Sequence, residues 1–138
     1  ALAETRLEVM RTRQVMSLSG GERQRAWIAM ALARQPEYLL LDEPTTYLDI
    51  AHQLEVMEII KRLNREHAMT VIMVLHDINH ALQYADEIAV IKDRQIFSTG
   101  TPHDVLNVAM LAEVFGVRAD IFTNSQGAQV LSPVSLVR

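Results

Sequence analysis

The stretch of residues 38–49, YLLLDEPTTYLD, limits what this 138-residue chain can fold into more than any other. Its first four residues form an apolar run of the kind found in buried strands. Asp42 and Glu43 follow directly, and Pro44 then stops the strand because it has no N–H to donate. Two carboxylates at the tip of a core strand are costly to desolvate, so they favour a place where a cation or reacting group faces them. Taken alone, the pair more often marks an ordinary turn.

A second apolar stretch, residues 70–75 (TVIMVL), has the composition of a strand that helices cover on both faces. His76 follows this stretch directly. A lone histidine at a strand end is more often structural than catalytic, and that reading applies to His76 by itself. If the two strands are parallel neighbours, however, Asp42, Glu43 and His76 converge at the carboxyl edge of one sheet.

Upstream, residues 18–24 read LSGGERQ and predict the start of a helix. Ser19 fits the N-cap of a capping box, and Glu22 lies three residues later, where it can reach back to the cap. Gly20 and Gly21 would let another backbone or a phosphate approach the N–H groups at the helix start. An ordinary capped helix is the alternative reading of this stretch, and the same cap geometry serves both.

Composition narrows the function classes. The chain has no cysteine, which excludes a disulfide framework and a thiolate metal site within it. Its net charge of -4 argues against binding to nucleic acid. No apolar run approaches the roughly 20 residues that span a bilayer, so we expect no direct membrane insertion and membrane contact only through a partner.

Together and in this order, the three segments resemble the ATP-binding-cassette (ABC) ATPases. LSGGE is similar to their signature motif, YLLLDEP to their Walker B strand, TYLD to their D-loop and His76 to their switch histidine. The resemblance covers essentially the whole chain, as the C-terminal half of an ATP-binding subunit. It implies an α/β fold, a partial P-loop NTPase core whose mostly parallel sheet is flanked by helices. Whole segments, such as VLHDINHALQYAD, look most like the ATPases of bacterial importers for iron-siderophores, haem and cobalamin.

The resemblance implies roles for the residues at the strand tips. The reaction would be attack of water on the γ-phosphate of ATP, with Mg²⁺ as the metal. By resemblance, Asp42 holds the Mg²⁺ through a water, Glu43 polarises the attacking water and His76 contacts the γ-phosphate. An unperturbed glutamate is a weak base, so positioning of the water by Glu43 matters more than proton abstraction.

The remaining site residues would act across a head-to-tail dimer with a second ATPase subunit. By resemblance, Ser19, Gly20 and Gly21 close over the γ-phosphate of ATP held by the opposite subunit. Asp49 of the D-loop would couple the two sites. Where the family most often has glutamine, this chain has Glu22, and a carboxylate aimed at a triphosphate would repel it. We therefore expect Glu22 to turn back as the capping-box partner.

One motif of the family is absent from these 138 residues. A P-loop needs a lysine directly after a glycine, and the only lysines, Lys61 and Lys92, do not follow one. We therefore expect the isolated chain to hydrolyse no ATP. In this superfamily the P-loop strand lies beside the switch-histidine strand, so the sheet is expected to have a vacant position. A non-enzymatic truncated module and a non-transport ABC ATPase of DNA repair or translation are the alternatives.

The expected organisation has three ranges: a signature-bearing helical segment (1–36), an α/β ATPase core (37–100), and C-terminal helices and small strands (101–138). The resemblance also implies transmembrane permease subunits as partners and a peripheral place on the cytoplasmic face of the inner (plasma) membrane. Where the family commonly has Asp-Gly, Arg94 predicts a different or strained turn. The helices expected run over about 20–34, 49–66 (with Asp49 as N-cap and Ile50, Leu54, Met57, Ile60 and Leu63 facing the core), 77–85 (with Asp77 as cap) and 108–115 (stopped by Gly116), and a short one begins at Thr101-Pro102 with Thr101 as cap. The strands expected are 87–92, 95–99, 118–122 and 129–131, with a frayed tail around Pro133.

Overall fold

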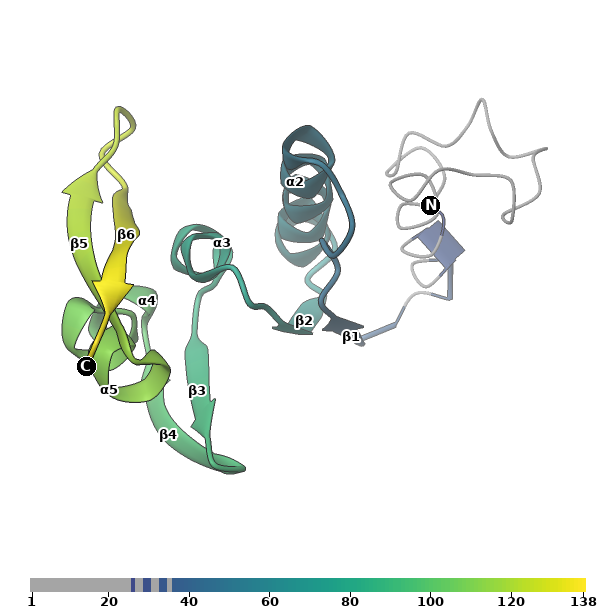
Figure 1. The fold of residues 1–138 in the computed structure, drawn as a ribbon. Helices are drawn as coiled ribbons and strands as arrows, with labels where there is room; N and C mark the ends of the chain where they lie inside the picture. The colour runs from purple at the N-terminus through teal and green to yellow at the C-terminus, as the bar shows by residue number, and fades with distance from the viewer. Residues whose placement is uncertain (1–25, 27–28, 31–32, 35) are drawn as a thin grey trace. The chain divides into compact units, whose positions relative to one another are not determined.

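The computed structural model describes residues 26, 29–30, 33–34 and 36–138, which form two compact units (Figure 1). The first ends at Leu75 and the second spans His76–Arg138. The boundary between the two units falls inside the predicted 37–100 core. The expected organisation into the ranges 1–36, 37–100 and 101–138 stays a prediction. Residues 26, 29, 30 and 33 are helical, as expected for the segment before Pro36.

Among the described residues of the first unit, the sheet consists of two parallel strands, β1 (Tyr38–Asp42) and β2 (Thr70–Val74), as the strand-tip argument required. Asp42 lies opposite Val74 in the register, so the carboxyl ends of both strands lie at the same edge. The connection between them is the helix α2 (Ile50–Glu66), which lies over one face of the pair (Figure 1). Alternate side chains of a strand point to the same face, so Leu39 and Leu41 of β1 share one face, and both are buried.

The apolar face of α2 differs from the predicted one. Met57, Ile60 and Leu63 are buried as predicted, but Ile50 is 77% exposed and Leu54 is 39% exposed. Val56 and Ile59 are buried with the first three. The buried stripe therefore runs from Val56 to Leu63 and leaves the residues of α2 before Val56 outside it.

The opposite face of the β1–β2 sheet is exposed, which corrects the expectation that helices cover β2 on both faces. Leu40 is 70% exposed, Ile72 is 56% exposed, and Val74 is 52% exposed. Strands of parallel sheets are apolar throughout when both faces are covered, so this sheet has the composition of a two-sided core strand pair. Within the described residues, α2 covers one of its faces.

The second unit combines two antiparallel hairpins with three short helices. Its core is formed by Val90, Val105, Leu106, Met110, Leu111, Ala119 and Leu131, with Ile78, Ala81, Leu82, Ile88 and Val114 packed around them. In chain order its elements are α3 (Ile78–Tyr84), β3 (Ile88–Lys92), β4 (Gln95–Gly100), α4 (Pro102–Val105), α5 (Val108–Phe115), β5 (Val117–Thr123) and β6 (Gln129–Leu136).

Side-chain caps and a glycine stop set the helix boundaries of this unit. Asp77 caps α3, Thr101 caps α4 ahead of Pro102, and Gly116 ends α5 with a φ of 66°. These boundaries agree with the caps and the glycine stop expected from the sequence, because both features are encoded by a few neighbouring residues.

The C-terminal tail is a strand rather than a frayed end. β6 continues past Pro133, which lies opposite Ala119, and a register shift between Arg118 and Ala119 accommodates it. The amide of Val137 also donates to the carbonyl of Gly116 at 2.8 Å. A proline is tolerated in a strand at such an irregularity, where it interrupts little of the ladder.

The turn between β3 and β4 is strained. Asp93 has a φ of 52° and Arg94 a φ of 64°, and a positive φ at both central residues is the geometry of a type I′ turn. The turn is thus of the type that Asp-Gly favours, which excludes the alternative of a different turn type. Arginine is unfavourable in this left-handed conformation because its Cβ crowds the backbone.

Replacing Arg94 with Gly is therefore expected to raise the free energy of unfolding by about 0.5–1 kcal/mol. Chemical denaturation of the parent and the variant measures the change. Gln95→Gly, one residue further on in extended backbone, is the matched control and is expected to lower stability. An Arg94→Gly variant less stable than the parent would contradict the assignment of strain to this turn.

Candidate functional site

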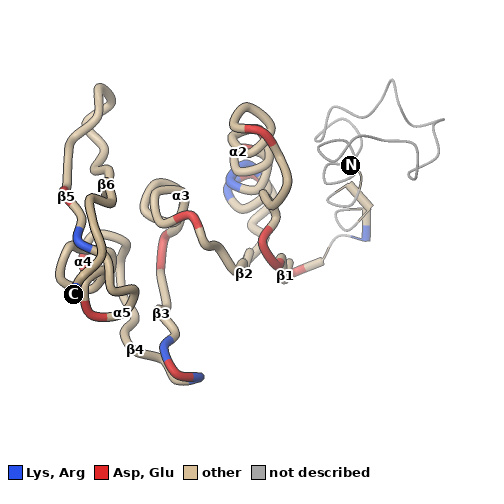
Figure 2. The backbone as a smooth tube through the Cα atoms, in the orientation of Figure 1, with Lys and Arg blue, Asp and Glu red and all other residues tan. Residues whose placement is uncertain are grey.

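The carboxylate pair lies where β1 ends beside β2. Asp42 is the last residue of β1 and is exposed, and Figure 2 marks the acidic segment that starts there. The amide of Glu43 donates to the carbonyl of Val74 at 2.9 Å, which extends the ladder one step beyond the strand. This backbone bond ties the position of Glu43 to the end of the neighbouring strand.

Glu43 adopts a backbone conformation that few residues other than glycine accept. Its φ is 50°, and strain of this kind persists only where surrounding bonds hold it. Here its carbonyl accepts from the amide of Thr46 at 3.2 Å, and Pro44 beside it is fully buried. The hydroxyl of Thr46 also donates to Oε2 of Glu43 at 3.2 Å. The carboxylate is therefore oriented from both its backbone and its side chain.

Thr46 is a site residue that the sequence argument did not single out. The available signal was its position three residues after Glu43, from which a hydroxyl can reach back to an acidic side chain. Tyr47 follows with a φ of 65° and is 99% exposed, so the loop that leaves the site turns sharply there.

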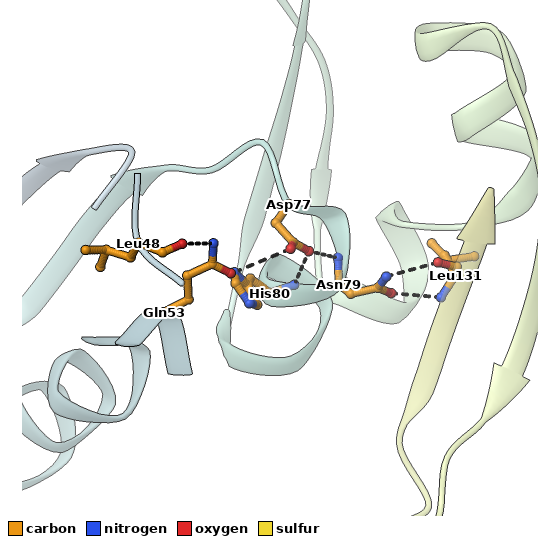
Figure 3. Close-up of polar contacts among 6 residues, drawn as sticks. All are labelled: Leu48, Gln53, Asp77, Asn79, His80 and Leu131. Atoms are coloured by element: carbon orange, nitrogen blue, oxygen red, sulfur yellow. Dashed lines mark hydrogen bonds and ion pairs between the residues drawn. The ribbon is translucent and has the colours of Figure 1, made fainter. Parts of the chain in front are cut away.

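Asp49 caps α2, as predicted. Its Oδ1 accepts from the amide of His52 at 2.9 Å and lies 2.9 Å from Nδ1 of the same histidine. The loop before it is held by the side-chain amide of Gln53, which donates to the carbonyl of Leu48 at 2.9 Å (Figure 3). The Asp49 side chain is 67% exposed despite the cap, so a role toward a second subunit remains sterically open.

His76 follows β2 by two residues and is exposed. Asp77, next to it, accepts from the amides of Asn79 and His80 at 2.9 and 3.0 Å and so starts α3 (Figure 3). Since Leu75 ends the first unit and His76 begins the second, the convergence of His76 with Asp42 and Glu43 stays a prediction. Ser19, Gly20 and Gly21 lie outside the described residues.

The carboxylate at the end of β1 is of the kind that proteins use to bind magnesium. Among the described residues, no group of three or more His, Cys, Asp or Glu side chains is placed so that it could hold a metal ion. Mg²⁺ commonly takes one or two carboxylates and completes its shell with water and substrate phosphates. The exposed carboxylate of Asp42 suits that mode of binding.

Comparison with known proteins places the chain in a family. The family model described as "ABC transporter" matches residues 1–46, the part that includes the signature-like segment and the end of β1. The petrobactin import ATP-binding protein FpuC of Bacillus anthracis is 57% identical over 126 residues, which cover 91% of this chain and 46% of that protein. The chain belongs to the ABC transporter ATP-binding proteins. The resemblance inferred from the motifs is confirmed.

Another member of the family matches nearly the same share of this chain. The iron(3+)-hydroxamate import ATP-binding protein FhuC of Bacillus subtilis is 47% identical over 124 residues, 90% of this chain and 46% of that protein. This ABC chain thus spans about half the length of the curated relatives it matches, and the match lies in their C-terminal half.

Solved structures confirm the α/β fold of the family. A metal-chelate type ABC transporter in an inward-facing conformation is 27% identical, has a TM-score of 0.89 and is matched over 97% of this chain and 55% of that one. A dimeric ATP-binding cassette in a post-hydrolysis state, bound to ADP and phosphate, is 36% identical with a TM-score of 0.64 over 73% of this chain and 44% of that one. Among the described residues of the ABC chain, no helix is long and apolar enough to cross a membrane.

Proposed function

We propose that this chain is the signature-bearing and water-activating part of an ATP-binding subunit that hydrolyses ATP to drive import. The observation that carries the proposal is the orientation of Glu43 at the carboxyl end of β1, by a bond to Val74 and by the hydroxyl of Thr46. In open parallel sheets this edge is where ligands bind. The family of the chain supports ATP as the ligand.

The chemistry requires an oriented water and neutralised charge on the transferring phosphoryl group. Glu43 accepts a hydrogen bond from the attacking water and aligns it, while His76 holds the γ-phosphate end of the nucleotide. Because the Glu43 carboxylate is fixed by Thr46, it orients the water without reorganising during the reaction. Asp42 is the residue that would hold Mg²⁺, and the bound ion would neutralise part of the negative charge of the nucleotide phosphates.

The second subunit completes each site in this proposal. Ser19, Gly20 and Gly21 of one subunit meet the γ-phosphate bound by the other, and Asp49 reaches across the same interface. The dimeric arrangement of a related ATP-binding cassette supports this pairing. Permease subunits carry the substrate across the inner membrane, and the ATP-binding subunit lies at its cytoplasmic face.

The cargo proposed is a ferric siderophore or a related metal chelate. The relatives matched over most of this chain are import proteins for petrobactin and for iron(3+)-hydroxamates, and a related solved transporter is of the metal-chelate type. Because an ATP-binding subunit does not touch the cargo, none of its residues identifies the chelate that is carried. The proposal of a metal-chelate importer therefore rests on the similarity of whole segments to such importers.

Separating this chain from the full-length protein is expected to remove ATP binding. Without a P-loop to wrap the β-phosphate, the isolated 138 residues should bind Mg-ATP at least about a hundredfold more weakly than the full-length protein and release no phosphate. Calorimetric titration and a phosphate-release assay on both proteins test this. Micromolar binding by the isolated chain, or a full-length protein that hydrolyses no ATP, would count against the proposed function.

A further inference from the structure

The side chain of Asn79 joins two parts of the second unit that lie 52 residues apart in the sequence. Its Nδ2 donates to the carbonyl of Leu131 at 3.0 Å, and its Oδ1 accepts from the amide of the same residue at 2.8 Å. The carboxamide thus pairs with the backbone of β6 as a neighbouring strand would (Figure 3). Both bonds are partly buried, so water competes poorly for them.

The paired bonds of Asn79 lie at the start of α3, close in the chain to His76. Asn79 lies in the first turn of α3, and its own amide donates to Oδ1 of Asp77, the residue directly after His76. The amide of His80 donates to the same oxygen, and Nδ1 of the buried His80 ring lies 3.7 Å from Oδ2 of Asp77. The residue next to His76 is therefore held by the same helical turn that Asn79 fixes to β6.

The β5–β6 hairpin in turn is anchored in the core of the second unit. Leu131 is 2% exposed and packs in one cluster with Ala119 of β5 and with residues of α4 and α5. Ile78, Ala81 and Leu82 of α3 pack against this cluster. Apolar packing holds α3 near the hairpin but is not directional, whereas the paired bonds of Asn79 fix the orientation of its first turn.

We infer that Asn79 is a positioning residue for His76, and that through it the C-terminal hairpin sets the orientation of the switch histidine. Asn79 does not touch nucleotide in this account. It fixes the first turn of α3 and thereby the chain direction at His76. The inference rests on the proposed function for the part that assigns His76 to the γ-phosphate.

The test compares Asn79→Ala with Asn107→Ala in the full-length protein. Asn107 caps α5 through its bond to the amide of Met110, so its removal also deletes a partly buried asparagine contact, but one local to α5. We expect Asn79→Ala to lower kcat about tenfold because His76 is displaced, while the Kd for Mg-ATP changes less than twofold. Asn107→Ala should keep kcat within twofold of the parent at a similar loss of thermal stability.

A second substitution covers the case in which Asn79→Ala does not fold. Asn79→Asp keeps the shape of the side chain and the acceptor for the Leu131 amide, but it sets a carboxylate oxygen against the Leu131 carbonyl. The same split between kcat and Kd is expected, together with faster hydrogen exchange of the Leu131 amide. A parental kcat in a folded variant whose Leu131 amide exchanges faster would overturn the inference, as would an equal loss of kcat in Asn107→Ala.

His76→Ala separates this inference from the proposed function. If His76→Ala lowers kcat and Asn79→Ala does not, the positioning role of Asn79 is wrong and the proposed function stands. If His76→Ala itself leaves kcat unchanged, the proposed role of His76 is wrong, and the role of Asn79 is overturned with it.

Discussion

Replacing Glu43 with Gln in the full-length protein is expected to lower the rate of ATP hydrolysis by about a hundredfold or more, while ATP binding survives. Glutamine matches the size of glutamate, and its side-chain oxygen can still accept from the Thr46 hydroxyl. It also leaves the bond between the residue 43 amide and Val74 in place. What it removes is the negative charge that orients the attacking water in the proposed mechanism.

Rate and affinity must be measured together for this variant. Phosphate release under saturating Mg-ATP gives the rate, and titration gives the Kd, which is expected to stay within about twofold of the parent. The variant should also accumulate as an ATP-bound closed dimer, visible by size-exclusion chromatography. Glu58→Gln is the matched control, because Glu58 is exposed on α2 and distant in sequence from the site. Near-parental hydrolysis by Glu43→Gln would remove Glu43 from the mechanism.

Local features of the fold were predictable from residue type. A strand stopped by Pro44, a cap at Asp49 and a left-handed stop at Gly116 each depend on a few neighbouring residues. The position of Asp42 and Glu43 beside β2, by contrast, depends on a strand distant in the sequence, and the polar tips of two apolar strands indicated it. The prediction needed only the assumption that the strands are parallel neighbours.

Features that depend on distant partners were not predictable. The exposure of Ile50 depends on where the core ends along α2, which its helical periodicity does not encode. The extension of β6 past Pro133 depends on a register shift in β5, and the Asn79 contact depends on a residue 52 positions away. Thr46 was missed because a threonine in a turn usually has no more than a local role, and its bond to Glu43 depends on an uncommon backbone conformation.

The role of Ser19 rests on the family motif and makes a prediction about pairs of subunits. A bulky cation at position 19 would block closure of the signature over the γ-phosphate bound by the opposite subunit. It would not touch the nucleotide that is bound by the subunit carrying the substitution. Ser19→Arg should therefore damage the site whose P-loop belongs to the partner. Two heterodimers of the full-length protein, each with one Ser19→Arg change and one inactive P-loop, distinguish action of Ser19 on the partner's nucleotide from action on the nucleotide of its own subunit.

The central claim, that this chain carries part of an ATP site completed by a second subunit, is tested most directly by the phosphate-release rates of these two heterodimers. With the changes in different subunits, the intact P-loop belongs to the subunit that carries Ser19→Arg and faces the unaltered signature of its partner, so one composite site remains whole and we expect about half of the parental rate. With both changes in one subunit, the intact P-loop of the partner faces the altered signature and neither composite site is whole, so hydrolysis should fall by about a hundredfold or more. Equal rates for the two arrangements, or a faster rate with both changes in one subunit, would contradict the claim when both proteins are folded and dimeric.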